Sequence, residues 1–170
     1  TMLDAAELEG DKESEGLASL LIPIVKGFVT DKGFESTINS QQVFGGHGYI
    51  EEWGMSQFVR DSRIAMIYEG TNGIQAIDLI GRKLSDSGKA ANGLIEEIKI
   101  TISDCSNHED RQIKDMGNGL SKSLVCLEST LNWMLKEEDF NNRLAGATPF
   151  LQAFGMILGA NYLVKAAMKS

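Results

Sequence analysis

Apolar positions recur every three or four residues along most of the chain, which is the spacing of amphipathic helices. Between residues 17 and 44 this pattern is nearly unbroken, and it predicts one long helix that includes Pro23. Three glycines within residues 45–48 predict the end of that helix. Before it, we expect the end of another helix over residues 2–8 and a polar loop over residues 9–14.

The middle of the chain predicts a loop and two shorter helices. Residues 49–54 are expected to form the loop and residues 55–63 the first helix, and an apolar run to Tyr68 follows it. The second helix begins at Thr71 or Asn72, because Asn72 and Gln75 have the spacing of a capping box. Its predicted apolar face consists of Ile74, Ile77, Ile80 and Leu84.

The rest of the chain predicts three more helices after a polar linker at residues 85–89. The first covers residues 90–104, with a strand over residues 98–102 as the alternative, because isoleucines alternate there. The second covers residues 109–137 and carries an apolar seam: Ile113, Met116, Leu120, Leu124, Leu127, Leu131 and Met134. The third is expected to begin with Thr148 as N-cap and Pro149 as its first residue. We therefore predict an all-α fold with two parts, residues 1–85 and residues 86–170.

Composition narrows the class of protein. The chain has 170 residues and a net charge of −8 without a basic cluster, so nucleic-acid binding is not expected. The apolar stretch 150–164 contains polar residues and is shorter than a membrane span, so we interpret it as a buried helix. Cys105 and Cys126 lack the spacing of a metal site, so we expect no metal and two reduced core cysteines in a cytoplasmic protein.

The first candidate site is the glycine-rich turn in QQVFGGHGYIEEWG, residues 41–54. Three glycines in four residues allow another backbone or a cofactor to approach closely, because no Cβ atoms obstruct it. The alternative is an ordinary helix C-cap followed by a tight turn, which the residues alone favour. The spacing differs from GxGxxG and no strand precedes it, which excludes a Rossmann nucleotide site.

The second candidate is Glu69, the single carboxylate of IAMIYEGTNGIQAIDLIG before the helix at residue 72. A carboxylate held out of water is a stronger base and suits the removal of a weakly acidic C–H proton. Backbone N–H groups beside it at a helix start can also hold a carbonyl oxygen that gains negative charge. The alternative is a surface glutamate that the helix dipole favours.

Together the two segments resemble the acyl-CoA dehydrogenase family. QQVFGGHGY is similar to its Q-x-x-G-G-x-G-aromatic motif, and RDSRIAMIYEGTNGIQ is similar to the segment that leads into its Y-E-G-T motif. The resemblance covers residues 1 to about 84 and implies the C-terminal part of that family's helical-bundle domain. Residues from about 90 onward resemble the extra helical domain of the longer, 3-methylmercaptopropionyl-CoA dehydrogenase-like bacterial members.

The resemblance implies an oxidoreductase of fatty acid metabolism that converts an acyl-CoA to the trans-2-enoyl-CoA, with hydride passing to FAD. Glu69 would then be the base, and Tyr68 and Gly70 would line the thioester site. The residues implied to contact FAD, partly from the neighbouring subunit, are Gln42, Gly45, Gly46, Thr71, Asn72 and Gly73.

The resemblance also implies a homodimer or tetramer and electron-transfer flavoprotein as the electron acceptor. The family's N-terminal and middle domains are not in these 170 residues, so we expect the chain alone to be inactive and not to retain FAD. Two other hypotheses remain open. The chain is a non-catalytic helical module for oligomerisation, or it belongs to an acyl-CoA oxidase, which uses the same base.

Overall fold

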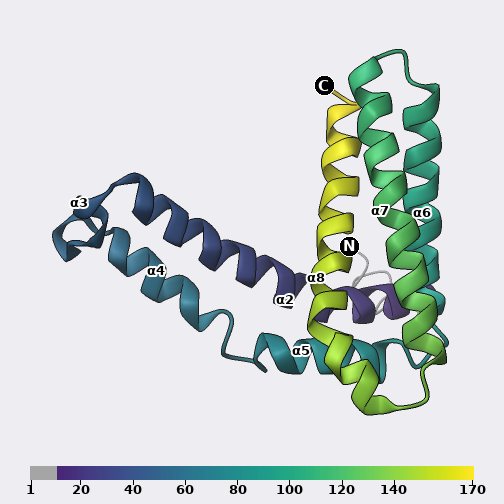
Figure 1. Cartoon of the computed structure of the whole chain (residues 1–170), viewed down its shortest axis with the longest axis horizontal. Coiled ribbons are helices and arrows are strands. Elements are labelled where there is room, and N and C mark those ends of the chain that lie inside the picture. The colour runs from purple at the N-terminus through teal and green to yellow at the C-terminus, as the bar shows by residue number, and fades with distance from the viewer. Residues whose placement is uncertain (1–10) are drawn as a thin grey trace.

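The computed structural model describes residues 11–170, and within this range every regular element is a helix. The all-α prediction is therefore confirmed. The predicted helix end at residues 2–8 lies outside the described residues. The helices form two parts, a long arm and an upright bundle that stands across its base (Figure 1).

The arm begins with the long helix α2, Lys12–Val43, which confirms the predicted helix. It starts earlier than expected, because the Asp11 side chain caps it by accepting a hydrogen bond from the Glu13 backbone N–H at 3.0 Å. The polar loop prediction is therefore wrong from residue 12 onward. The helix ends where Gly45 adopts a left-handed φ of 59°.

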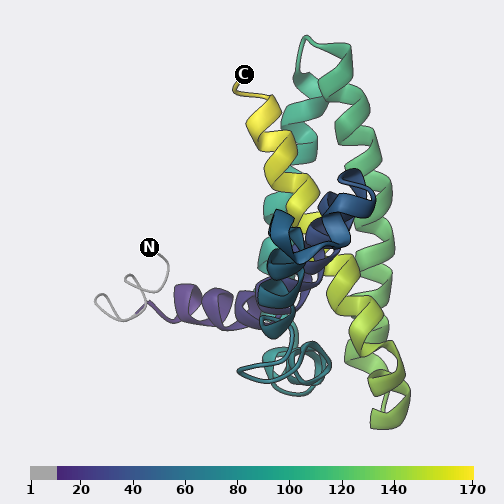
Figure 2. The same cartoon turned by 90° about the vertical axis from the view of Figure 1, so that its left-hand side faces the viewer.

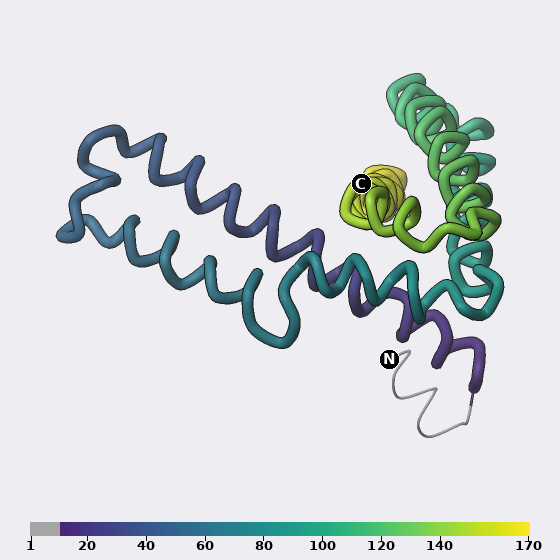
Figure 3. Tube along the Cα trace, turned by 60° about the horizontal axis from the view of Figure 1, so that its bottom comes forward, coloured from purple at the N-terminus to yellow at the C-terminus, as the bar shows by residue number. Residues whose placement is uncertain are grey.

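At the outer end of the arm the chain turns back through α3, Gly46–Tyr49, and the 3-10 helix η1, Glu51–Trp53. These short helices replace the loop predicted for residues 49–54. Helix α4, Met55–Ile64, confirms the predicted short helix and returns antiparallel to α2 (Figure 3). The hydroxyl groups of Thr37 and Ser62 lie 2.9 Å apart and join the two helices.

Helix α5, Asn72–Asp78, continues directly into the π-helix η2, Leu79–Lys83. The N-cap is Thr71, whose side chain accepts from the Ile74 N–H, so the capping box predicted for Asn72 and Gln75 is wrong. The predicted apolar face is also partly wrong, because Ile74 and Ile77 are 55% and 41% exposed. The side that packs on α2 and α8 carries Ala76, Leu79, Ile80 and Leu84 instead.

The bundle consists of α6, Lys89–Asn107, α7, Arg111–Lys136, and α8, Phe140–Ala167. Helix α6 confirms the helix at residues 90–104 and makes the strand alternative wrong. Helix α7 confirms the predicted seam except at Met116, which is exposed while Gly117 takes the buried position. Figure 2 shows α6 and α7 side by side with α8 beside them.

The predicted start of the last helix is wrong. Asp139 caps α8 by accepting from the Asn141 backbone N–H at 2.9 Å, so Thr148 and Pro149 lie inside the helix. A proline removes the hydrogen bond to the carbonyl four residues earlier, here that of Ala145. Ala145 is exposed, so water can bind that carbonyl and the helix continues.

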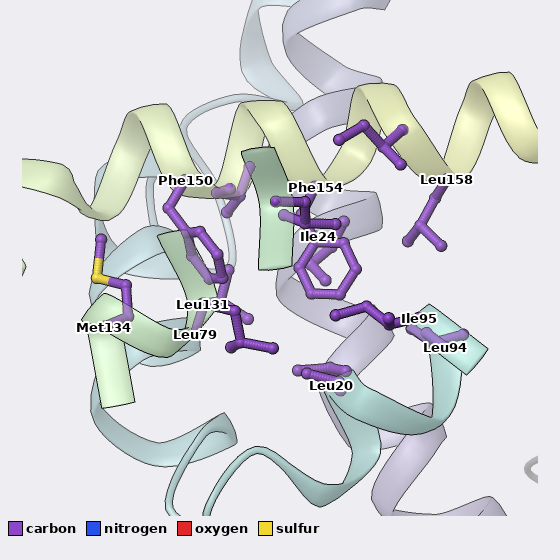
Figure 4. Packing of buried hydrophobic residues seen from close by; sticks show 14 of the residues in the cluster. Leu20, Ile24, Leu79, Leu94, Ile95, Leu131, Met134, Phe150, Phe154 and Leu158 are labelled. Carbon is purple, nitrogen blue, oxygen red and sulfur yellow. The ribbon is translucent and has the colours of Figure 1, made fainter. Parts of the chain in front are cut away.

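One hydrophobic core joins the two parts of the chain (Figure 4). Phe150 and Phe154 of α8 lie among Leu20 and Ile24 of α2, and side chains of η2, α6 and α7 complete the cluster. The core therefore contains residues from both sides of the boundary predicted at residue 85, which stays a prediction.

The prediction for the two cysteines is only partly confirmed. Both cysteines are free thiols, but only Cys105 is buried, so the core location predicted for Cys126 is wrong.

Helix α8 is long and apolar enough to cross a membrane by length and composition alone. Its inner side, however, carries nine buried residues of this fold, including Phe150 and Phe154, which supports the interpretation as a core helix.

Candidate active site

Glu69 lies in a strained turn between α4 and α5. Its φ is 55° and that of Gly70 is 85°, so two consecutive residues are left-handed. For a residue with a Cβ atom this conformation costs about 1–2 kcal/mol. Such strained residues concentrate at functional sites, where the surrounding structure holds them in place.

Three hydrogen bonds hold the turn. The Asn72 backbone N–H donates to the Met66 carbonyl oxygen at 3.2 Å and closes the loop. The side-chain amide of Gln75 donates to the Glu69 carbonyl oxygen at 3.0 Å. The Lys26 ammonium of α2 donates to the Gly70 carbonyl oxygen at 2.6 Å. Both carbonyls of the left-handed pair therefore accept hydrogen bonds from side chains.

The other polar groups of the turn have no partner within residues 11–170. Within residues 11–170 the Glu69 carboxylate has neither a hydrogen bond nor an ion pair, and its side chain is exposed. In the same range the backbone N–H groups of Glu69, Gly70 and Thr71 donate to no protein acceptor. One short turn thus presents a free base beside three free N–H donors.

The shielding from water that we expected for Glu69 is not provided by the residues that the structure describes. Apolar side chains flank the turn in the sequence but are themselves about half exposed: Ile64, Ile67, Tyr68 and Ile74. A protein surface or substrate that covers this apolar border would also remove water from the carboxylate.

The described structure requires glycine at two of the three glycine positions at the tip of the arm. Gly45 needs its left-handed φ, and a Cβ atom on Gly48 would lie 2.2 Å from the Gln41 carbonyl oxygen. A Cβ atom on Gly46 would meet nothing within 4 Å. Neither conformation nor packing inside the described part of the chain therefore requires glycine at position 46. The neighbouring Gln42 is exposed.

The structure does not bring the two candidate segments together within one chain. The glycine turn is at the outer end of the arm, and the Glu69 turn follows the opposite end of α4 (Figures 1 and 3). The two turns are therefore separate sites within one chain.

The three residues after Gly70 are placed differently. Thr71 and Gly73 are exposed at the start of α5, and nothing lies closer than 3.9 Å to a Cβ atom placed on Gly73. The Asn72 side chain points inward, where it bonds Lys26 at 2.8 Å and Asp31 at 2.6 Å. Any contact between Asn72 and a cofactor therefore falls to its backbone.

Lys26, Asp31 and Gln75 are the residues of this site that the sequence did not reveal. Lys26 and Thr30 are polar positions one turn apart in a helix whose neighbouring positions are apolar, which is the only signal the sequence offers. Their partners are more than forty residues away along the chain, so the pairing follows from the fold alone.

Comparisons with known proteins cover nearly the whole chain. A family model described as "Acyl-CoA dehydrogenase, C-terminal domain" matches residues 1–85, and one described as "Acetyl-CoA dehydrogenase C-terminal like" matches residues 94–170. These matches confirm the family resemblance, including that of the C-terminal extension.

Individual relatives agree with the family models. The chain is 38% identical over 159 residues to the 3-methylmercaptopropionyl-CoA dehydrogenase of Ruegeria pomeroyi, which covers 90% of this chain and 27% of that protein. It is 37% identical over 82 residues to the broad-specificity linear acyl-CoA dehydrogenase FadE5 of Mycobacterium tuberculosis, covering 46% and 13%. It is 38% identical over 80 residues to a butyryl-CoA dehydrogenase of Syntrophomonas wolfei, covering 47% and 13%. The chain thus spans 27% or less of the length of these relatives.

Proposed function

Because this chain belongs to the acyl-CoA dehydrogenase family, we propose that it forms the C-terminal part of an FAD-dependent enzyme that oxidises an acyl-CoA to the trans-2-enoyl-CoA. The observation that carries the proposal is the strained turn at Glu69 and Gly70, with its unpaired carboxylate and free N–H groups. Strained residues of this kind cluster at functional sites, which supports a role for this turn.

In this proposal the Glu69 carboxylate removes the proton from the carbon next to the thioester carbonyl. The N–H groups of Glu69 and Gly70 donate to the thioester oxygen as it gains negative charge, which lowers the barrier to proton loss. Bound FAD supplies a hydride acceptor for the β-carbon. The bonds from Gln75 and Lys26 keep the base and the N–H donors in fixed relative positions.

The residues proposed to hold FAD fit that role by their exposure. Gly46 leaves open space where a Cβ atom would otherwise stand, so a planar group or a backbone can approach it closely. Gln42 and Gly45 flank it at the tip of the arm, and Thr71, Gly73 and the backbone of Asn72 are at the start of α5. Since these two sets lie apart in one chain, we propose that the tip contacts the FAD of a neighbouring subunit.

The proposal therefore includes a homodimer or tetramer. Tyr68 and the apolar residues near Glu69 would be covered by the acyl-CoA and by the remaining domains of the enzyme, which would shield the base from water. Electron-transfer flavoprotein as the electron acceptor, a role in fatty acid metabolism and a cytoplasmic location belong to the same proposal and rest on family membership.

The test uses the complete enzyme that contains this sequence, with Glu69→Gln as the isosteric variant. A panel of acyl-CoAs and an artificial electron acceptor measure turnover. We expect the substitution to lower turnover by roughly 10²–10⁴-fold, which is typical for loss of a general base. The matched control is Glu109→Gln, because Glu109 is an exposed glutamate between α6 and α7, outside both candidate segments, and this variant should keep normal turnover. Equal activity of the two variants would contradict the proposal.

A second measurement separates dehydrogenase from oxidase. For a dehydrogenase we expect little hydrogen peroxide during aerobic turnover without an added acceptor. Its molar amount should stay far below the amount of substrate that the enzyme consumes when an acceptor is present. Peroxide formed in equal amount to the enoyl product would show an oxidase. The 170-residue chain alone is expected to show neither activity. FAD that is added to it should be separated from the chain on a desalting column.

A further inference from the structure

We propose that Gln152 of helix α8 is a positioning residue for the turn that contains Glu69, acting through a chain of hydrogen bonds across α2. The C-terminal bundle would thereby control the geometry of the active site without touching the substrate. The inference rests on the proposed function only in its last step, in which a displaced turn lowers the rate of proton removal.

The first hydrogen bonds of this path join three helices. The Gln152 side-chain N–H₂ of α8 donates to Asp31 Oδ2 of α2, although the two residues are 121 positions apart. The other oxygen of that carboxylate, Asp31 Oδ1, accepts from Asn72 Nδ2 of α5 at 2.6 Å. Asp31 therefore connects the bundle to the helix that follows the active-site turn.

The last links reach the turn itself. The Asn72 side-chain oxygen accepts from the Lys26 ammonium at 2.8 Å, and the same ammonium donates to the Gly70 carbonyl oxygen at 2.6 Å. Thr30 completes the cluster by accepting from Asn72 Nδ2 at 3.0 Å. A continuous path of donors and acceptors thus runs from α8 to the residue beside Glu69.

The charges of Lys26 and Asp31 favour one orientation of the Asn72 side-chain amide. The Asn72 amide lies between a cation and an anion, with its oxygen on Lys26 and its nitrogen on Asp31. Within residues 11–170 neither Lys26 nor Asp31 forms an ion pair, so each charge is balanced through hydrogen bonds of this cluster. All the side chains concerned are half-buried, and charged hydrogen bonds are stronger where water is partly excluded.

The end of the path on α8 is held firmly. Leu151 lies against Gly27 of α2, where a Cβ atom would come within 2.8 Å of Leu151 Cδ2. Phe28 lies equally tightly against Gly155. Because these contacts flank Gln152 on both sides, the position of its amide relative to α2 is fixed by packing and not by the hydrogen bond alone.

The consequence of losing the Gln152 donor follows from charge. Asp31 would lose one of its two amide donors, and a half-buried carboxylate that lacks a hydrogen-bond partner attracts a nearby cation. Lys26 is such a cation, because it bonds the same Asn72 side chain as Asp31. Movement of the ammonium toward Asp31 would remove the donor from the Gly70 carbonyl and release the left-handed turn.

The first experiment uses the 170-residue chain and needs no activity. Gln152→Glu preserves the shape of the side chain and removes the donor, whereas Gln152→Lys supplies a charged donor in its place. Lys165→Met is the matched control, because Lys165 joins α8 to Glu97 of α6 outside this cluster. The readout is the set of backbone amide resonances of residues 66–73 in ¹H–¹⁵N NMR spectra.

We expect Gln152→Glu to displace the amide resonances of Gly70 and Thr71 and the side-chain resonances of Asn72. Gln152→Lys should return them toward their original positions, and Lys165→Met should leave them unchanged. Unchanged resonances of residues 66–73 in Gln152→Glu would overturn the proposal. A displacement of the same size in the Lys165→Met control would overturn it too, since the effect would then be general loosening of α8.

The second experiment measures kcat and KM of the complete enzyme with the same variants. Gln152→Glu should lower kcat by roughly tenfold with little change in KM, because misplacement of a reacting group acts on the chemical step. Gln152→Lys should restore most of the loss. A displaced turn with unaltered kcat would contradict the catalytic role of Glu69, while the link between Gln152 and the turn would stand.

Discussion

Phe28 of α2 lies directly against Gly155 of α8, and a Cβ atom on Gly155 would stand 2.4 Å from the Phe28 ring atom Cγ and 2.5 Å from its Cβ. This contact joins the arm to the C-terminal bundle at the edge of the shared core, where Phe28 is partly buried. Because Phe28 Cβ is attached to the helix backbone, no rotation of the side chain can relieve the clash with this atom.

We predict that Gly155→Ala destabilises the chain by about 1–3 kcal/mol, the usual cost of overpacking a close contact. Urea unfolding followed by circular dichroism measures this change. Gly159→Ala, one turn away on the same helix, is the control, since a Cβ atom there meets nothing within 4 Å among residues 11–170. That substitution should stabilise the chain by up to about 1 kcal/mol, because alanine favours helix. Equal effects of the two substitutions would contradict the packing described for α2 and α8.

Glu69→Gly is predicted to stabilise the chain while it removes the proposed base. Glycine adopts a φ of 55° without the strain that a Cβ atom causes, so relief of about 1 kcal/mol is expected. The reference is Glu69→Ala, which also removes the carboxylate but keeps the Cβ atom. If thermal unfolding gives the glycine variant no advantage over the alanine variant, the turn is not strained.

The start of α8 gives a third prediction. Asp139→Ala should cost about 1 kcal/mol, because it leaves the Asn141 N–H without its capping acceptor. Thr148→Ala changes the residue that the sequence indicated as the cap, and it should alter the free energy of unfolding by less than about 0.5 kcal/mol. Chemical denaturation of both variants measures the difference, and the reverse order would place the start of the helix at Thr148.

The two cysteines should differ in reactivity. Burial raises the pKa of the Cys105 thiol, so it stays protonated and covered, whereas Cys126 is exposed. At about pH 8 a thiol reagent such as DTNB should modify one cysteine quickly in the folded chain and the second only after unfolding. Rapid modification of both would contradict the burial of Cys105.

The raised pKa of Cys105 also affects stability at alkaline pH. An unfolded thiol loses its proton above about pH 8.5, while the buried thiol keeps it. The folded state then binds more protons than the unfolded state, so stability falls as pH rises through this range. Cys105→Ala should reduce that part of the alkaline loss, and unfolding curves at increasing pH would measure it.

Sequence periodicity predicted those helices whose buried faces repeat regularly. The seam of α7 from Leu120 to Met134 is an example, because each buried position lies three or four residues from the last and one partner surface covers them all. The prediction failed where a local rule competed with another. Pro149 follows a good capping residue, yet Asp139 provides a stronger cap farther upstream and an exposed face tolerates the proline.

Only some features of the candidate site could be predicted from the sequence. Motifs carried by neighbouring residues, at Gly45 and Gly46 and at Glu69, were apparent in the sequence because their residues are adjacent. The left-handed conformation of Glu69 was not, because glutamate rarely adopts it and tertiary contacts impose it. The contact between Gln152 and Asp31 was likewise invisible, since it depends on how α8 crosses α2.

The proton-removing role of Glu69 is tested most directly by flavin reduction in a single turnover. The complete enzyme, with Glu69→Gln and with the control Glu109→Gln, is mixed without oxygen with an acyl-CoA that it oxidises, and the loss of flavin absorbance is followed. We predict that the control is reduced at the rate of the unaltered enzyme and that Glu69→Gln is reduced at least roughly 10²-fold more slowly. Reduction of Glu69→Gln at the same rate as the control would contradict the assignment of Glu69 as the base.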